Sequence, residues 1–168
     1  MGKYIFVCSI AFVLIGCVGP MASRKDVTND TRYWGEYKPD EELLLVADVY
    51  LQKKYNNLIP EKYYNNTSSK KNLDFSWPSN FDEYLKTPEQ YPEFAILRKG
   101  IIVKCAKIYF VDNVSWSTID ISGIISTGDF KDTNVSLRFL SIAANDSPEG
   151  GVYCLKPNPS YLKLLEKK

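Results

Sequence analysis

Apolar and polar residues alternate through much of the second half of the chain, as they do in β-strands that bury one face. Between residues 101 and 111 the apolar positions keep one phase up to Cys105 and the opposite phase from Ala106 onward. A one-residue slip moves every later side chain to the other face of a sheet. The sequence therefore predicts a strand with a bulge between these two residues.

Further segments repeat this alternation. Residues 43–51 and 116–125 each predict a strand, and residues 152–155 predict a short one. Residues 133–143 predict a strand that changes phase midway, as 101–111 does. Strands of this kind bend strongly, which is typical of small barrels.

Two short helices complete the expected elements. Residues 81–85 predict one or two helical turns that are capped by Ser79 or Asn80 and end before Pro88. A last short helix is expected to start at Ser160. The expected fold class is mostly β, a small bent barrel or compact sandwich with one or two short peripheral helices.

The start of the chain has the layout of an export signal. Lys3 precedes an uncharged, mainly apolar run from Tyr4 to Ile15, and small residues follow it. A membrane-spanning helix is the alternative interpretation. A span needs about 20 apolar residues, however, and Gly16, Gly19 and Pro20 interrupt the run.

The segment Leu14-Ile15-Gly16-Cys17 resembles the lipobox of bacterial lipoproteins and stands at the end of the apolar run. The resemblance implies cleavage before Cys17, acylation of its thiol and attachment to the membrane through the acyl chains. Stable attachment takes at least about two such chains. Val18 stands where Asp would favour the inner membrane, so the implied location is the cell envelope at the outer membrane. A conventional signal peptide with a coincidental cysteine is the alternative.

The chain is thus expected to have three parts. Residues 1–16 are a signal peptide, residues 17–32 are the acylated cysteine with a flexible tether, and residues 33–168 form a single β-rich domain. Within the domain, residues 96–103 resemble a short sequence motif of bacterial SH3-like barrels. That likeness implies no ligand site.

Composition limits the possible functions. The chain contains no histidine, which removes Ser-His-Asp and Cys-His catalysis and most zinc and iron sites. The whole chain has 21 basic and 20 acidic residues, and loss of Lys3 with the signal leaves a neutral mature chain. Neutrality argues against nucleic acid as a partner, because nucleic acid is bound by a basic surface.

Local motifs add no catalytic site. The sequence lacks the nucleotide-binding and hydrolase motifs that carry a known mechanism. Asp129 with Asp132, and Asp112 with Asp120, do not follow the spacing of a calcium loop and indicate turns. We therefore expect no cofactor, no metal site and no catalytic residue.

Four residues besides Cys17 are candidates for a site. Cys105 and Cys154 predict one disulfide, because an exported domain folds in an oxidising compartment; two buried thiols are the alternative. Tyr63 and Tyr64 lie in a polar stretch and are a possible interaction surface. Other aromatic residues are assigned to the core, and the alternative is a stacking face formed by Tyr33, Trp34, Trp77, Tyr91 and Trp116.

The leading function is a non-catalytic binding or assembly module, anchored in the envelope, with an envelope protein as its partner. One alternative is an inhibitor or immunity lipoprotein that inserts residues 52–72 or 144–151, both expected to be loops, into a hydrolase. Another alternative is a hydrolase that uses two carboxylates distant in the sequence.

Overall fold

A computed structural model of the protein describes residues 23–62, 78, 80–113, 116–144 and 152–165. The strands in that part of the chain are β1 (Ser23–Asp26), β2 (Glu42–Leu45), β3 (Val49–Gln52), β4 (Asn57–Ile59), β5 (Phe94–Leu97), β6 (Ile102–Asn113), β7 (Trp116–Ile125), β8 (Asn134–Ser136), β9 (Ser141–Ala143), β10 (Leu155–Pro157) and β11 (Leu162–Leu164). The α-helix is α1 (Phe81–Lys86), and three 3-10 helices are η1 (Thr31–Tyr33), η4 (Pro88–Gln90) and η5 (Arg138–Leu140).

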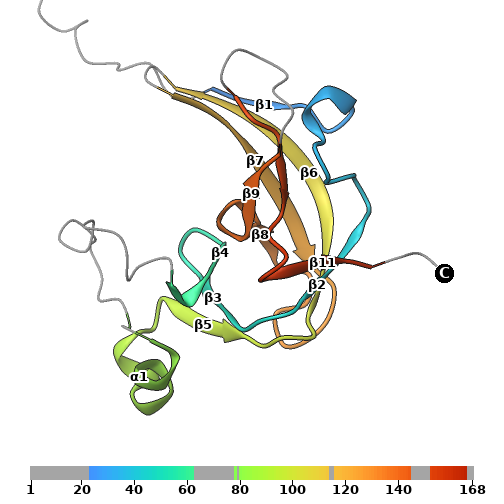
Figure 1. The fold of residues 1–168 in the computed structure, drawn as a ribbon. Helices are drawn as coiled ribbons and strands as arrows, with labels where there is room; N and C mark the ends of the chain where they lie inside the picture. Colours follow the sequence, from blue (N-terminus) through green and yellow to red (C-terminus); the bar gives the residue numbers. More distant parts are fainter. Residues whose placement is uncertain (1–22, 63–77, 79, 114–115, 145–151, 166–168) are drawn as a thin grey trace, which may run out of the picture.

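Nine of these strands form one mixed sheet, which confirms the mostly β fold class. The strand order is β11-β2-β6-β7-β8-β4-β3-β5, and β1 lies beside the second half of β6. The long hairpin of β6 and β7 curves through the molecule (Figure 1). Among the described strands no ladder joins β11 to β5, so the sheet is bent but not closed into a barrel.

The bulge in β6 lies where the alternation predicts it. The register between β6 and β7 shifts between Cys105 and Lys107, which leaves Ala106 as the extra residue. As a result, Val103 and Cys105 before the bulge and Ile108 after it all point into the core and are fully buried. The chain turns into this strand at Gly100, which takes a positive φ of 94°.

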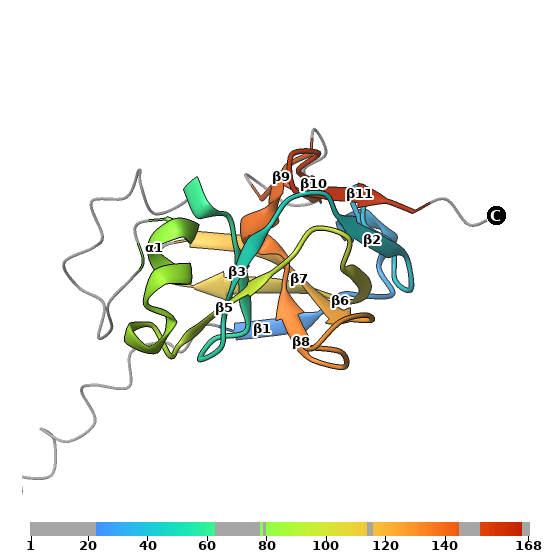
Figure 2. The ribbon, with the colours of Figure 1, turned by 90° about the horizontal axis from the view of Figure 1, so that it is seen from below.

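Three predicted elements differ in the structure. The strand expected over 43–51 is divided into β2 and β3, and β2 joins one end of the sheet while β3 lies near the other (Figure 2). The bent strand expected over 133–143 is two strands in different sheets, β8 and β9, because η5 turns the chain between them. The strand expected over 152–155 is β10, which starts at Leu155 and pairs with β9.

The prediction of a final helix from Ser160 is wrong. Residues Leu162–Leu164 form β11, which pairs antiparallel with β2, and Leu162 lies opposite Leu45. Only this distant pairing distinguishes a strand from a helix for so short an apolar run. The helix expected over 81–85 is confirmed as α1, and the Asn80 side chain accepts a hydrogen bond from the Glu83 amide at 2.8 Å.

Two boundaries also need correction. The flexible tether expected over 17–32 does not extend to residue 32, because β1 pairs with β6 from Ser23 onward and Val27 is buried in the core. Likewise, the loop expected over 52–72 contains β4, whose Leu58 and Ile59 are fully buried. Part of the segment proposed to enter a hydrolase is therefore fixed inside the sheet.

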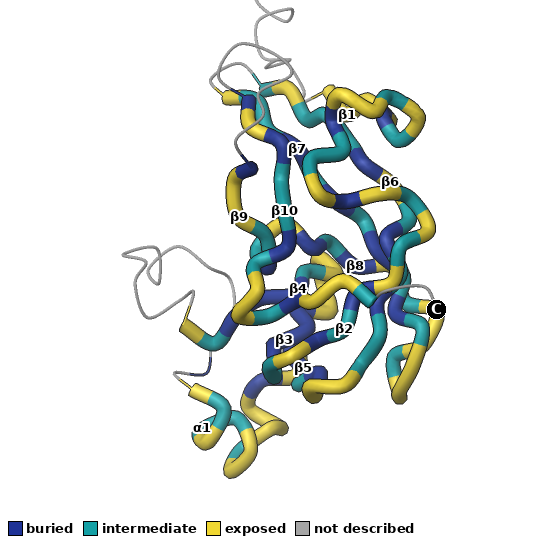
Figure 3. Tube along the Cα trace, turned by 45° about the vertical axis from the view of Figure 1, so that its right-hand side comes forward, coloured by how far each residue is buried: buried dark blue, intermediate teal, exposed yellow. Residues whose placement is uncertain are grey.

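Two apolar clusters stabilise the fold. The larger one fills the inside of the bent sheet, and the smaller one lies between α1 and the strands β3 and β5. Tyr50 of β3 is its centre, with ring centroids 4.6 Å from Phe81 and 6.0 Å from Phe94. Strand β3 is thus buried on both faces, whereas α1 has no buried residue (Figure 3).

Candidate functional site

The outer face of the sheet carries a row of polar side chains. On β7 the inward residues Ile119 and Ile121 are fully buried, while Trp116, Asp120 and Ser122 alternate with them on the other face. Because side chains on a strand alternate between the two faces, this polar phase points away from the core, with Asp120 and Ser122 partly exposed.

Two adjoining hollows of about 240 and 290 Å³ lie on this face. We call them together the Asp120 groove, because both are lined by Arg24, Asn57, Asp120 and Ser136. The other lining residues are Tyr55, Asn56, Ser122, Asn134 and Val135 in one hollow and Val111, Arg138 and Phe139 in the other.

The carboxylate of Asp120 is held at the centre of the groove. The Arg24 guanidinium lies 2.9 Å from its Oδ2, and the Ser136 hydroxyl donates a hydrogen bond of 2.7 Å to its Oδ1. Arg24 also lies over the Tyr109 ring, 3.8 Å from the ring centroid. These contacts fix the side chains of β1, β7 and β8 before any ligand is present.

Two exposed aromatic rings lie in or beside the groove. Tyr55 follows β3, is 54% exposed and lines one hollow. Trp116, at the start of β7, is 44% exposed, and the guanidinium of Arg138 lies 5.5 Å from its ring centroid. Arg138 itself lines the second hollow. Exposed rings beside polar groups are typical of binding surfaces, where a ring supplies contact area at a small cost in entropy.

Charge in the groove has a slight positive excess. Arg24 and Asp120 offset each other, and Arg138 makes no ion pair with a carboxylate of the described part of the chain. The groove can therefore bind polar groups at its centre and an acidic group beside Arg138.

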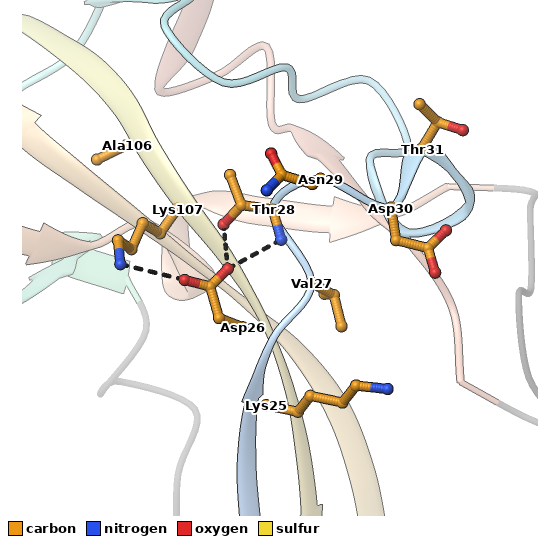
Figure 4. A pocket seen from close by; sticks show the side chains of 9 residues that line it. All are labelled: Lys25, Asp26, Val27, Thr28, Asn29, Asp30, Thr31, Ala106 and Lys107. Carbon is orange, nitrogen blue, oxygen red and sulfur yellow. Dashed lines mark hydrogen bonds and ion pairs between the residues drawn. The ribbon is translucent and has the colours of Figure 1, made fainter.

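A third hollow, of about 850 Å³, lies apart from the Asp120 groove beside the bulge and is lined by residues 25–31 with Ala106 and Lys107 (Figure 4). Asp26 accepts hydrogen bonds from the Thr28 hydroxyl and amide, and Lys107 donates to it at 3.1 Å. The Thr28 hydroxyl, followed by the Thr28 amide and Lys107, lowers the pKa of Asp26 to about 2. Because these groups form hydrogen bonds with one another, we assign them a structural role: they hold the turn after β1 against β6.

The predicted disulfide is wrong. Cys105 and Cys154 are both buried thiols and no bond joins them. Cys105 points from β6 into the core, whereas the Cys154 thiol donates to the Arg32 carbonyl at 3.1 Å. Burial raises the pKa of Cys105 to about 12, with smaller contributions from Glu41 and Asp40. The thiol is therefore kept protonated and unreactive at neutral pH.

Other sequence candidates have different outcomes. Cys17, Tyr63 and Tyr64 lie outside the described residues, as does Trp77. Tyr33 and Tyr91 are buried and Trp34 packs against the core, which agrees with their assignment to packing. In the part of the chain that the structure describes, no three His, Cys, Asp or Glu side chains form a group able to hold a metal.

The groove could not be found from the sequence, because its residues come from β1, β4, β6, β7, β8 and η5 and from the turn before β4. Asp120 was assigned to a turn, yet it lies in the middle of β7. The available signal was the polar phase of 116–125, in which an aromatic ring, an acid and hydroxyls share one face.

Comparison of the chain with protein families, with curated proteins and with solved structures finds no match. The function must therefore be argued from the site itself.

Proposed function

We propose that this protein is an envelope lipoprotein that is held by acyl chains on Cys17 and binds a ligand in the Asp120 groove without catalysing a reaction. The observation that carries the proposal is the groove. It has a fixed polar floor, the exposed Tyr55 ring lines it, and the exposed Arg138 guanidinium beside Trp116 makes no ion pair within the described chain.

The state of the groove carboxylate supports binding rather than catalysis. A general acid or base must exchange a proton with a reacting group within hydrogen-bond reach. Both oxygens of Asp120 already accept from Arg24 and Ser136, and its side chain is 17% exposed. A carboxylate in this position orients Arg24 and Ser136, which both line the groove.

Sequence features support the anchor. The export signal and the motif ending at Cys17 account for attachment, and Val18 favours the outer membrane. Since the mature chain is neutral, acyl chains rather than charge would hold it to a lipid surface. No helix within the described ranges is long and apolar enough to cross a membrane.

The anchor is tested by growing cells with labelled palmitate. We expect label in the wild-type protein and none in Cys17→Ser, with the wild type sedimenting with outer membranes. An unlabelled wild type would end the lipoprotein proposal.

Binding is tested with the full-length chain, immobilised in detergent and exposed to solubilised envelope material. The Trp116→Ala/Arg138→Gln variant should retain less of the bound component than the wild type. Lys163→Ala, an exposed change on β11, is the matched control. Equal retention by wild type, groove variant and control would contradict a function in the groove.

A further inference from the structure

We infer that the Asp120 groove binds an acidic oligosaccharide, an inference that rests on the proposed binding function and specifies its ligand. Three observations lead to this ligand class: the polar groups on the floor, the exposed aromatic rings in and beside the groove, and the position of the excess positive charge.

The floor of the groove suits hydroxyl groups. Asn57 and Asn134 supply side-chain amides, Ser122 a hydroxyl, and Arg24 further N–H donors next to its ion pair with Asp120. Amides and hydroxyls donate and accept at once, as sugar hydroxyls do. Because the central charges are already paired, ligand hydroxyls meet a floor that needs no counter-ion.

The exposed aromatic rings suit the packing of sugar rings. One face of a sugar ring is lined by C–H groups and is apolar, so it packs on the flat face of an aromatic side chain. Tyr55, which is 54% exposed, lines one hollow, and Trp116, which is 44% exposed, lies beside Arg138 of the other hollow, so both rings are available for such contacts. A chain of several sugar units would use both rings.

The charge selects an acidic sugar. Arg138 lies beside the Trp116 ring and, among the described side chains, makes no ion pair. A carboxylate on a sugar that packs against Trp116 would accept a bidentate pair of hydrogen bonds from the Arg138 guanidinium. A neutral sugar has no charged group that could pair with the Arg138 guanidinium.

The arrangement of strands disfavours a peptide. An extended peptide usually binds by adding a strand to a free sheet edge. The floor of the groove lies inside the sheet, since β8 is hydrogen-bonded to β7 on one side and to β4 on the other. Recognition there must use side chains on a face, which suits a ligand whose polar groups surround its rings.

The experiment uses the full-length chain in detergent on an array of oligosaccharides of equal length, neutral or containing a uronic or sialic acid. Isothermal titration then measures the affinity of the acidic probe that binds best and of its neutral counterpart. We expect the acidic probe to bind about tenfold more tightly, the order of effect for one charged hydrogen-bonded contact. This preference should decrease with added salt.

Variants assign the effect to residues. Arg138→Gln should abolish the preference for the acidic probe, whereas Arg138→Lys should restore part of it. Trp116→Ala should weaken both probes about tenfold, and Lys163→Ala should change neither. A thermal unfolding curve for each variant separates lost binding from lost folding.

Each outcome decides the inference. Equal affinity for acidic and neutral probes, binding that Trp116→Ala leaves intact, or no binding to any saccharide would overturn it. If no saccharide binds but the groove variant still loses envelope material, the inference fails and the proposed function stands. Identification of that material as a protein alone would overturn the inference in the same way.

Discussion

The Arg24 guanidinium on β1 lies 2.9 Å from the Asp120 carboxylate on β7, although β6 separates these two strands in the sheet. The ion pair therefore connects strands that share no backbone hydrogen bonds. It adds to the backbone pairing with β6 that holds a short strand of exposed residues, Ser23–Asp26, on the sheet.

This ion pair should contribute a small, measurable coupling. Arg24 is 51% exposed and Asp120 17%, so solvent screens the pair and its contribution is expected at about 0.2–1 kcal/mol. A double-mutant cycle with Arg24→Gln and Asp120→Asn, followed by urea unfolding, measures it. The coupling should fall in high salt, and additive single changes would show that the pair does not stabilise the fold.

The two buried thiols should be protected in the folded protein. At pH 8 neither Cys105 nor Cys154 should react with a thiol reagent, because both are fully buried and the pKa of Cys105 is raised to about 12. In urea without reductant, both should react. A mature chain with no reactive thiol in urea would instead indicate that the two residues are oxidised to a disulfide.

The turn after β1 should make folding stability depend on acid pH. The pKa of Asp26 is about 2 in the folded protein and about 3.9 in an unfolded chain. A lowered folded-state pKa stabilises the protein above the unfolded value, and this stabilisation is lost as the pH falls from about 4 to 2. Urea midpoints measured across that range should change less for Asp26→Asn than for the wild type.

A control isolates the cause of this pH dependence. Thr28→Ala removes the hydroxyl that lowers the pKa most, so titration of Asp26 by NMR should shift toward its ordinary value. An Asp26 pKa near 4 in the wild type would contradict the hydrogen bonds described for the turn.

Two glycines should differ in their tolerance of alanine. Gly35 has a φ of +56°, and a Cβ there would lie 2.3 Å from the Leu155 carbonyl oxygen. Gly100 has a φ of +94°, but a Cβ there would meet nothing within 4 Å. Gly35→Ala should destabilise by about 3 kcal/mol or more, from overpacking plus backbone strain, and Gly100→Ala by about 1–2 from strain alone. Urea unfolding of both variants checks the order, which equal losses would contradict.

Much of the fold could be predicted where the signal is local. The bulge at Ala106, the cap at Asn80 and the turn at Gly100 each follow from a few neighbouring residues. The division of residues 43–51 could not be predicted, because its alternation continues while the chain passes from one part of the sheet to another. Leu162–Leu164 is a strand only because β2 is available to pair with it.

The candidate groove could not be predicted either, because it too depends on pairing between distant segments. Asp120, Arg24 and Ser136 are remote in the sequence, and their contact depends on the strand order. Exposure of Trp116 likewise depends on which face of β7 the rest of the chain covers. Sequence could predict polar residues on one strand face, but not which other strands complete the site.

The pairing of Ser23–Asp26 with β6 changes how far the domain can stand from a lipid surface. With Cys17 acylated as proposed, the chain to Ser23 spans at most about 22 Å, whereas a tether reaching Tyr33 would allow about 55 Å. Arg24 follows directly, so the groove would be held within a few nanometres of the bilayer. With the proposed anchor, a connection of this length would restrict the domain to ligands displayed at the membrane surface.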